Sequence, residues 1–94
     1  MVIQKTAQAG TLESNDIMVM LAPAQAGAEI DIILTSLVEK QYGDRIKAVI
    51  KNVLIEAGIS DALVHANDKG ALDCTIRARV TTAISRATVQ EGTV

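Results

Sequence analysis

The chain has 94 residues, a length that suits one domain and is too short for two. Hydrophobic residues make up 49% of the chain, which is enough for a packed core. The formal net charge is −2, and there is one tyrosine but no tryptophan or phenylalanine, so the chain lacks both the basic surface and the stacking aromatics of a nucleic-acid binder. Its apolar runs are shorter than the roughly 20 residues that span a bilayer, and its first ten residues lack the apolar stretch of a signal peptide. We therefore expect one cytoplasmic domain over residues 1–94, without nucleic acid or membrane as a partner.

The N-terminal region shows little regular pattern before its first polar turn. We expect residues 1–10 to be flexible or to form a poor edge strand. A polar cluster over 13–16 follows, in which Asn15 and Asp16 suit a turn because their side chains bond the local backbone and tolerate left-handed conformations. The predicted turn displays Ser14 directly before the next apolar run.

Two apolar runs come next and predict two β-strands. Residues 17–22 are rich in strand formers and are followed by Pro23, the only proline. Residues 29–35 alternate, with Ile30, Ile32 and Leu34 on one side. Because few residues separate the two runs, we expect them to pair as a hairpin.

The clearest helical pattern begins near Ser36, which together with Glu39 has the spacing of a capping box. Gly43 would weaken a helix by roughly 1 kcal/mol and predicts an irregularity, and Gly58 predicts the C-terminal end. Apolar residues recur at steps of three and four and predict one buried stripe: Tyr42, Ile46, Val49, Ile50, Val53, Leu54 and Ala57.

The second half of the chain predicts a third strand over 61–67, a turn over 67–70 and a second helix from Ala71. We expect residues 89–94 to be a flexible tail. The order β-β-α-β-α predicts an α+β two-layer sandwich, in which two helices cover a small mixed or antiparallel sheet of about three or four strands. The first helix would then form a right-handed crossover.

Candidate chemical groups are scattered along the chain. The aspartates lie on predicted turns and element ends, where capping or solvated roles are usual: Asp16, Asp31, Asp68 and Asp73. We expect His65 to be a half-buried structural residue. The single cysteine, Cys74, excludes an internal disulfide and a cysteine-rich zinc site. We expect it to be a small buried residue, although a helix N-terminus can make a thiol reactive.

Residue chemistry alone leaves the function open. Ser14 reads as an ordinary turn serine. Three arginines of the second predicted helix, Arg77, Arg79 and Arg86, predict either a solvated face or a small basic surface that meets a partner or an acidic cofactor.

Three blocks of the sequence resemble the acyl carrier subunit, or gamma chain, of bacterial citrate lyase. The first is Ala-Gly-Thr-Leu-Glu-Ser over 9–14, which leads through Asp16 into an apolar strand. The second, over 36–44, contains Val-Glu-Lys-Gln-Tyr-Gly-Asp, and the third is Asn-Asp-Lys-Gly-Ala-Leu-Asp-Cys over 67–74, continued by Ile-Arg-Ala-Arg and later by Arg-Ala. The blocks fall in the family's order and cover most of the chain, and none is a generic motif.

The resemblance implies a carrier subunit without catalytic or metal sites of its own. Ser14 would carry 2'-(5''-phosphoribosyl)-3'-dephospho-coenzyme A through a covalent phosphodiester, attached by a dedicated transferase. The arm would hold an acetyl or citryl thioester while an alpha subunit transfers the acyl group and a beta subunit cleaves the citryl thioester. Citrate would thereby yield acetate and oxaloacetate. Separately from the resemblance, we expect Arg77 and Arg79 to meet a partner or the phosphates of the arm.

Three alternatives stay open beside this interpretation. The first is the carrier subunit of malonate decarboxylase, which uses the same kind of group, although the 67–74 block favours citrate lyase. The others are a non-catalytic α+β binding module and a small enzyme that uses Cys74 or His65. Two features depart from the expected pattern: Asn15 stands where some relatives are expected to have a small residue, and no extended segment follows Val94.

Overall fold

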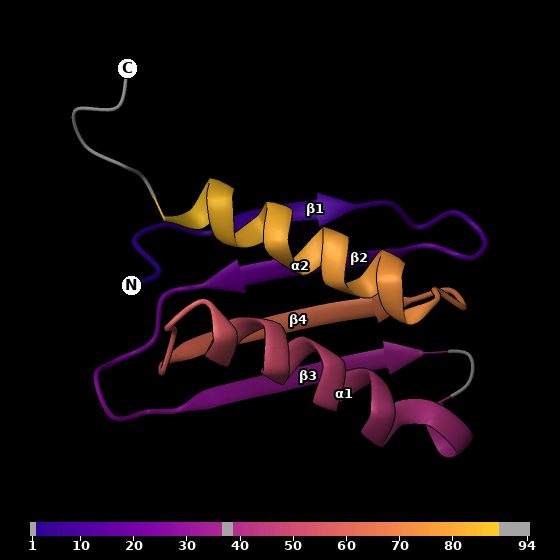
Figure 1. The fold of residues 1–94 in the computed structure, drawn as a ribbon, viewed down its shortest axis with the longest axis horizontal. Coiled ribbons are helices and arrows are strands. Elements are labelled where there is room, and N and C mark those ends of the chain that lie inside the picture. The colour runs from indigo at the N-terminus through magenta and orange to yellow at the C-terminus, as the bar shows by residue number, and fades with distance from the viewer. Residues whose placement is uncertain (1, 37–38, 89–94) are drawn as a thin grey trace.

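The fold is described from a computed structural model, which places residues 2–36 and 39–88 (Figure 1). These residues form four strands and two helices, in the order β1 (Ala7–Gly10), β2 (Ile17–Ala22), β3 (Ile30–Ser36), α1 (Glu39–Glu56), β4 (Ala62–Asp68) and α2 (Asp73–Ala87). Both helices lie on one face of the sheet (Figure 1). The predicted α+β class is confirmed. The order differs by one strand, because β1 forms within the segment that showed little pattern.

The sheet has the strand order β1-β2-β4-β3. Strand β2 is antiparallel to β1 and to β4, whereas β3 is parallel to β4. The predicted hairpin of 17–22 with 29–35 is therefore wrong, since β4 lies between these strands. The connection over 23–29 crosses two strand spacings, which amount to about 10 Å. The hairpin of this fold is β1–β2 instead, joined by residues 11–16.

Helix α1 connects the parallel strands β3 and β4, as the predicted crossover requires. It runs without interruption through Gly43, so the predicted irregularity is wrong. Its end is confirmed at Gly58, whose φ of +82° accompanies a Schellman pair of hydrogen bonds. The Gly58 N–H donates to the Ile55 carbonyl at 2.9 Å, and the Ile59 N–H donates to the Leu54 carbonyl at 2.9 Å.

The start of α1 is described only in part. The predicted capping box of Ser36 and Glu39 spans residues 37–38, which lie outside the described residues, as does the predicted tail over 89–94. Ser36 itself is the last residue of β3, and its hydroxyl donates to Oδ2 of Asp68 at 2.9 Å.

The core lies between the sheet and the helices and is aliphatic. Alternate residues of β2 and β4 point into it, and the apolar stripe of α1 packs against them. Tyr42 is the exception in that stripe, because it is 52% exposed. His65 is also exposed, since it lies between the buried Val64 and Ala66 and so points away from the helices. The prediction of a half-buried histidine is wrong. No helix in the described part of the chain is long and apolar enough to cross a membrane.

Candidate functional site at the Ser14 loop

Residues 11–16 form the loop between β1 and β2 and place Ser14 at an exposed turn. The Asp16 N–H donates to the Glu13 carbonyl at 3.2 Å and closes this turn. Asn15 has a φ of +65°, which asparagine tolerates better than most residues. Both the predicted turn and the display of Ser14 within it are confirmed. We call residues 11–16 the Ser14 loop.

Asp16 is the anchor of the Ser14 loop on its β1–β2 side. Its carboxylate accepts hydrogen bonds from Nε of Arg79 at 3.0 Å, from Nη2 of Arg79 at 2.8 Å and from the Thr11 hydroxyl at 2.7 Å. The Ile17 N–H adds a fourth at 2.7 Å. The Arg79 guanidinium, followed by the Thr11 hydroxyl, holds the pKa of Asp16 well below its usual range. The carboxylate is therefore ionised at neutral pH and joins the two ends of the loop.

This arrangement corrects one sequence-based expectation. Asp16 is buried and ion-paired, whereas a capping or solvated role was expected for it. Arg79 binds Asp16 within the chain, although its side chain remains 39% exposed. The two other arginines of α2 also have internal partners: Nη2 of Arg77 lies 2.7 Å from Glu56, and Nη1 of Arg86 donates to the Gln8 carbonyl at 2.9 Å. Each of the three arginines thus has a partner within the chain, and a role of this surface toward another subunit or the arm stays a prediction.

A second anchor joins the Ser14 loop to the turn between β4 and α2. The Asn15 N–H donates to the Lys69 carbonyl at 2.8 Å, and the Lys69 N–H donates to the Asp16 carbonyl at 2.9 Å. The turn itself is held by the buried Asp68, whose carboxylate accepts the N–H groups of Gly70 and Ala71 at 3.1 and 3.0 Å. The predicted turn is confirmed, but the capping role expected for Asp68 is wrong, because the N-cap of α2 is Leu72 and has no side-chain hydrogen bond.

The three sequence blocks that carry the family resemblance meet at one end of the molecule. The first block covers residues 11–14 of the Ser14 loop, and the third contains the β4–α2 turn that binds this loop. The second block reaches the third through Ser36 and Asp68. Figure 1 shows the β1–β2 loop, the end of β3 and the start of α2 at the same end of the sheet.

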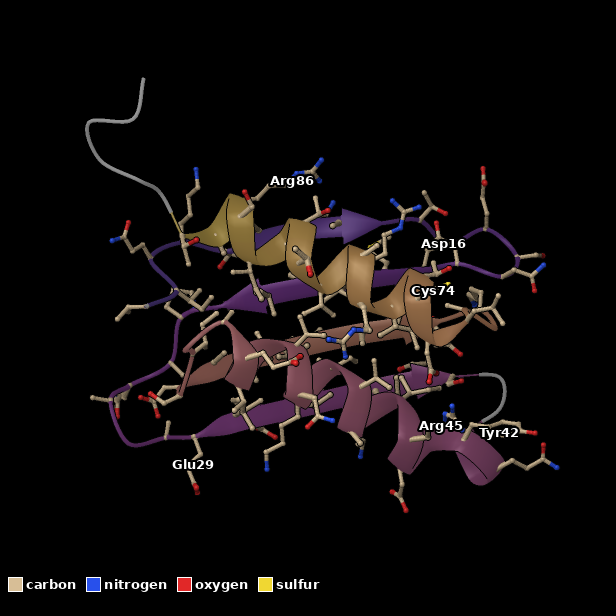
Figure 2. All side chains as sticks on the ribbon, viewed as in Figure 1. Asp16, Glu29, Tyr42, Arg45, Cys74 and Arg86 are labelled. Atoms are coloured by element: carbon tan, nitrogen blue, oxygen red, sulfur yellow. The ribbon has the colours of Figure 1, made fainter. Side chains whose placement is uncertain are left out.

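A groove of about 630 Å³ lies beside the Ser14 loop, between α1 and the β4–α2 turn. Figure 2 shows Tyr42, Arg45 and Cys74 at this end of the molecule. Nη2 of Arg45 forms an ion pair with Asp73 at 2.8 Å, and this pair lowers the pKa of Asp73. Cys74 is exposed, so the expectation of a buried thiol is wrong. The groove is lined by Tyr42, Arg45, Ile46, Asp68, Gly70, Ala71, Leu72, Asp73 and Cys74.

The Ser14 loop is suited to the presentation of a side chain. Within residues 2–36 and 39–88, no three His, Cys, Asp or Glu side chains are grouped so that they could hold a metal ion. His65 lies on the open face of the sheet and Cys74 at the start of α2, so the two residues of the small-enzyme alternative are on different parts of the fold. What the site offers is an exposed hydroxyl on a loop that is fixed from two sides.

Comparisons with known proteins agree on a class. A family model described as malonate decarboxylase delta subunit (MdcD) matches residues 4–87. In the solved crystal structure of a Pseudomonas malonate decarboxylase hetero-tetramer in complex with malonate, one chain matches with a TM-score of 0.75, covering 93% of this chain and 88% of that one. At 21% identity, this likeness shows a common fold. The family-model match places the chain in the ACP family, which is described as malonate decarboxylase delta subunit.

Closer relatives are citrate lyase acyl carrier proteins. That of Lacticaseibacillus casei (strain BL23) is 53% identical over 87 residues, covering 93% of this chain and 84% of the relative. That of Oenococcus oeni is 53% identical over 91 residues, covering 97% and 92%. The chain belongs to the citrate lyase acyl carrier protein family. It is an acyl carrier subunit rather than a catalytic one.

Sequence reasoning singled out Ser14 but missed the residues that hold its loop. Thr11 lay in the first block and Asp16 two residues beyond it, yet nothing in the spacing indicated Arg79 as the partner of Asp16, 63 positions further along the chain. The Lys69 backbone was missed for the same reason. The one available signal was that these residues fall within the blocks shared with the family.

Proposed function

We propose that this chain is the acyl carrier subunit of citrate lyase and that Ser14 is the attachment residue for 2'-(5''-phosphoribosyl)-3'-dephospho-coenzyme A. The observation that carries the proposal is the exposed position of Ser14 on a loop held by Asp16 and Lys69. A phosphodiester needs an accessible hydroxyl, and a transferase needs a loop that keeps one shape while the bond forms. The residues present therefore fit the group.

When attached, the group supplies a terminal thiol on a long arm, where an acyl group is held as a thioester. The protein provides the fixed end of that arm. Arg79 and Thr11 hold the Asp16 carboxylate, and Asn15 binds the Lys69 carbonyl through its N–H, so that the residues on both sides of the attachment point are anchored. Motion is thereby confined to the arm itself. A flexible tether raises the effective concentration of a reactive group at the neighbouring sites that it can reach.

We further propose that the partners are an alpha subunit that transfers the acyl group, a beta subunit that cleaves the citryl group, and the transferase that modifies Ser14. The overall reaction is the cleavage of citrate to acetate and oxaloacetate, and it takes place in the cytoplasm. Sharing one arm between two active sites explains why a carrier needs an exposed attachment point at one end. The end that bears Ser14 also holds all three family blocks, which supports its role as the face presented to partners.

Malonate decarboxylase is the second candidate. The family model with that description and the structural neighbour both favour it. The relatives at 53% identity favour citrate lyase over most of the chain. Since the two enzymes would place the same carrier beside different partner subunits, the choice is decided by the subunits that this chain activates.

Reconstitution tests the proposal. The modified chain is combined either with citrate lyase alpha and beta subunits or with malonate decarboxylase subunits, and the release of oxaloacetate or of CO₂ is measured. We expect turnover of citrate alone, its loss in Ser14→Ala and its retention in Ser60→Ala, which removes another exposed hydroxyl. Full citrate cleavage by the Ser14→Ala complex would contradict the attachment site, and turnover of malonate alone would establish the second candidate.

A further inference from the structure

We propose that the groove beside the Ser14 loop is a resting site for the arm attached at Ser14, in which Tyr42, Leu72 and the residues around Cys74 cover the distal part of the arm when no partner holds it. This inference rests on the proposed function. It assigns a role to the groove lined by the third family block, and the attachment at Ser14 alone does not require such a groove.

The groove and the attachment loop share a wall. The Asn15 N–H donates to the Lys69 carbonyl, and a Cβ atom on Gly70 would lie 3.6 Å from Oδ1 of Asn15. Gly70 is at the same time a lining residue of the groove. An arm that starts at Ser14 therefore has to cross only one turn of backbone to enter it.

The lining of the groove suits a chain of methylene and amide groups that ends in a thiol. Leu72 and Tyr42, which are 70% and 52% exposed, present apolar surface that a bound chain would cover. Arg45 adds N–H groups at the rim, beside its partner Asp73, and can also meet amide carbonyls or phosphate oxygens. The volume of about 630 Å³ lies within the range of small-ligand sites.

The attached arm is a more suitable occupant of the groove than a free ligand, because it is tethered nearby. A free ligand would need to hold such an open groove by affinity alone, whereas an attached arm samples it at high effective concentration, so that weak contacts are enough to populate the resting state. Weak contacts are also what a carrier needs, because the arm must leave whenever a partner site offers stronger ones.

Tyr42 provides the first test, because it is the only aromatic side chain of the protein. Its fluorescence and the NMR signals of its ring are compared between the modified protein and the unmodified one. We expect a change on modification that Leu72→Gln removes. The matched control is Ile55→Gln, which changes another exposed apolar residue, 54% exposed and outside this groove, and should preserve the change.

Disulfide trapping provides the second test. An added azodicarboxamide oxidant takes up the two thiol hydrogens as one S–S bond forms between the arm and Cys74, which is recorded as a loss of two hydrogens from the intact mass. The control is the double variant Cys74→Ser, Ala78→Cys. Ala78 is exposed one helical turn further along α2, next to the Arg79 that contacts the loop, and does not line the groove. We expect trapping at Cys74 to be at least about tenfold faster.

Equal trapping rates together with an unchanged Tyr42 signal, in protein whose mass shows the arm, would overturn the resting site while leaving the attachment at Ser14 intact. A Tyr42 signal that depends on protein concentration and appears equally without modification would overturn it as well, because it would show a second copy in the groove. Absence of the added mass before either measurement would contradict the proposed function itself and the resting site with it.

Discussion

The guanidinium of Arg79 donates hydrogen bonds to both carboxylate oxygens of Asp16, at 3.0 and 2.8 Å, although the two residues are 63 positions apart in the sequence. The pair joins the middle of α2 to the last residue of the Ser14 loop (Figure 2 labels Asp16 beside this helix). Two parallel N–H···O bonds fix orientation as well as distance. This contact therefore holds the Ser14 loop against the body of the protein.

Arg79→Met keeps much of the aliphatic stem and removes the guanidinium. Because Asp16 then loses its only arginine, we expect the loop to open more often, with hydrogen exchange at the Asn15 and Lys69 amides about tenfold faster. Those two amides report the loop because they donate the hydrogen bonds that join it to the β4–α2 turn. The measurement is amide exchange followed by NMR.

Arg77→Met is the matched control, since Arg77 is two residues away on the same helix. Its ion pair with Glu56 joins side chains that are 49% and 62% exposed, and such pairs contribute little. Exchange at Asn15 and Lys69 should match that of the parent protein. Equal acceleration by both substitutions would show that the Asp16 contact does not hold the loop.

Acid should weaken the protein through Asp16. Its folded pKa is lowered from an ordinary value of 3.8 by Arg79 and Thr11, so its stabilisation is present above the unfolded pKa and is lost as the pH falls below it toward the folded pKa. We expect Asp16→Asn to lower the free energy of unfolding at pH 7 by about 1–3 kcal/mol. The difference from the parent protein should shrink between about pH 4 and pH 2.

Urea titrations at several pH values measure this difference. Asp61 and Asp73 also have lowered pKa values, but both remain in the two proteins, so the comparison isolates Asp16. A difference that stays constant down to pH 2 would mean that the folded carboxylate gains nothing from its partners.

The backbone conformation directly before the Ser14 loop requires glycine at position 10. Gly10 has a φ of +96°, and a Cβ atom there would lie 1.8 Å from the Ile17 carbonyl oxygen. We expect Gly10→Ala to cost about 3–5 kcal/mol, since it combines backbone strain with a backbone clash. Gly27→Ala is the comparison: the φ is +86° but nothing lies within 4 Å, so only the strain of about 1–2 kcal/mol remains. Equal losses in thermal or urea unfolding would refute the clash.

The elements that local pattern determines were predictable. The stripe of α1 and its end at Gly58, the alternation of β3 and the turn before α2 depend on residues a few positions apart. The pairing of the strands did not follow in the same way. Strands β2 and β3 are neighbours along the chain, yet β4 enters between them, and it does so because the crossover through α1 places β4 parallel to β3.

In the candidate site, too, local features were predictable and contacts between distant residues were not. Asn15 and Asp16 were enough to predict a turn that displays Ser14. The attachment role proposed for Ser14 could be inferred only from the family blocks. The Asp16–Arg79 pair and the Asn15–Lys69 hydrogen bond join residues far apart in sequence, so the spacing of residues along the chain does not predict these contacts. The exposure of Cys74 and Tyr42 likewise depends on where the sheet ends, which the order of elements does not specify.

The most direct test of the carrier role is the intact mass of this protein produced in a citrate-fermenting host. We expect an added mass equal to that of 2'-(5''-phosphoribosyl)-3'-dephospho-coenzyme A joined through a phosphodiester, found on the peptide that contains Ser14. It should be absent from Ser14→Ala, whose unfolding midpoint should match that of the parent because the Ser14 side chain is exposed. The same added mass on folded Ser14→Ala, or unmodified protein that supports full citrate cleavage, would contradict the assignment of Ser14 as the attachment residue.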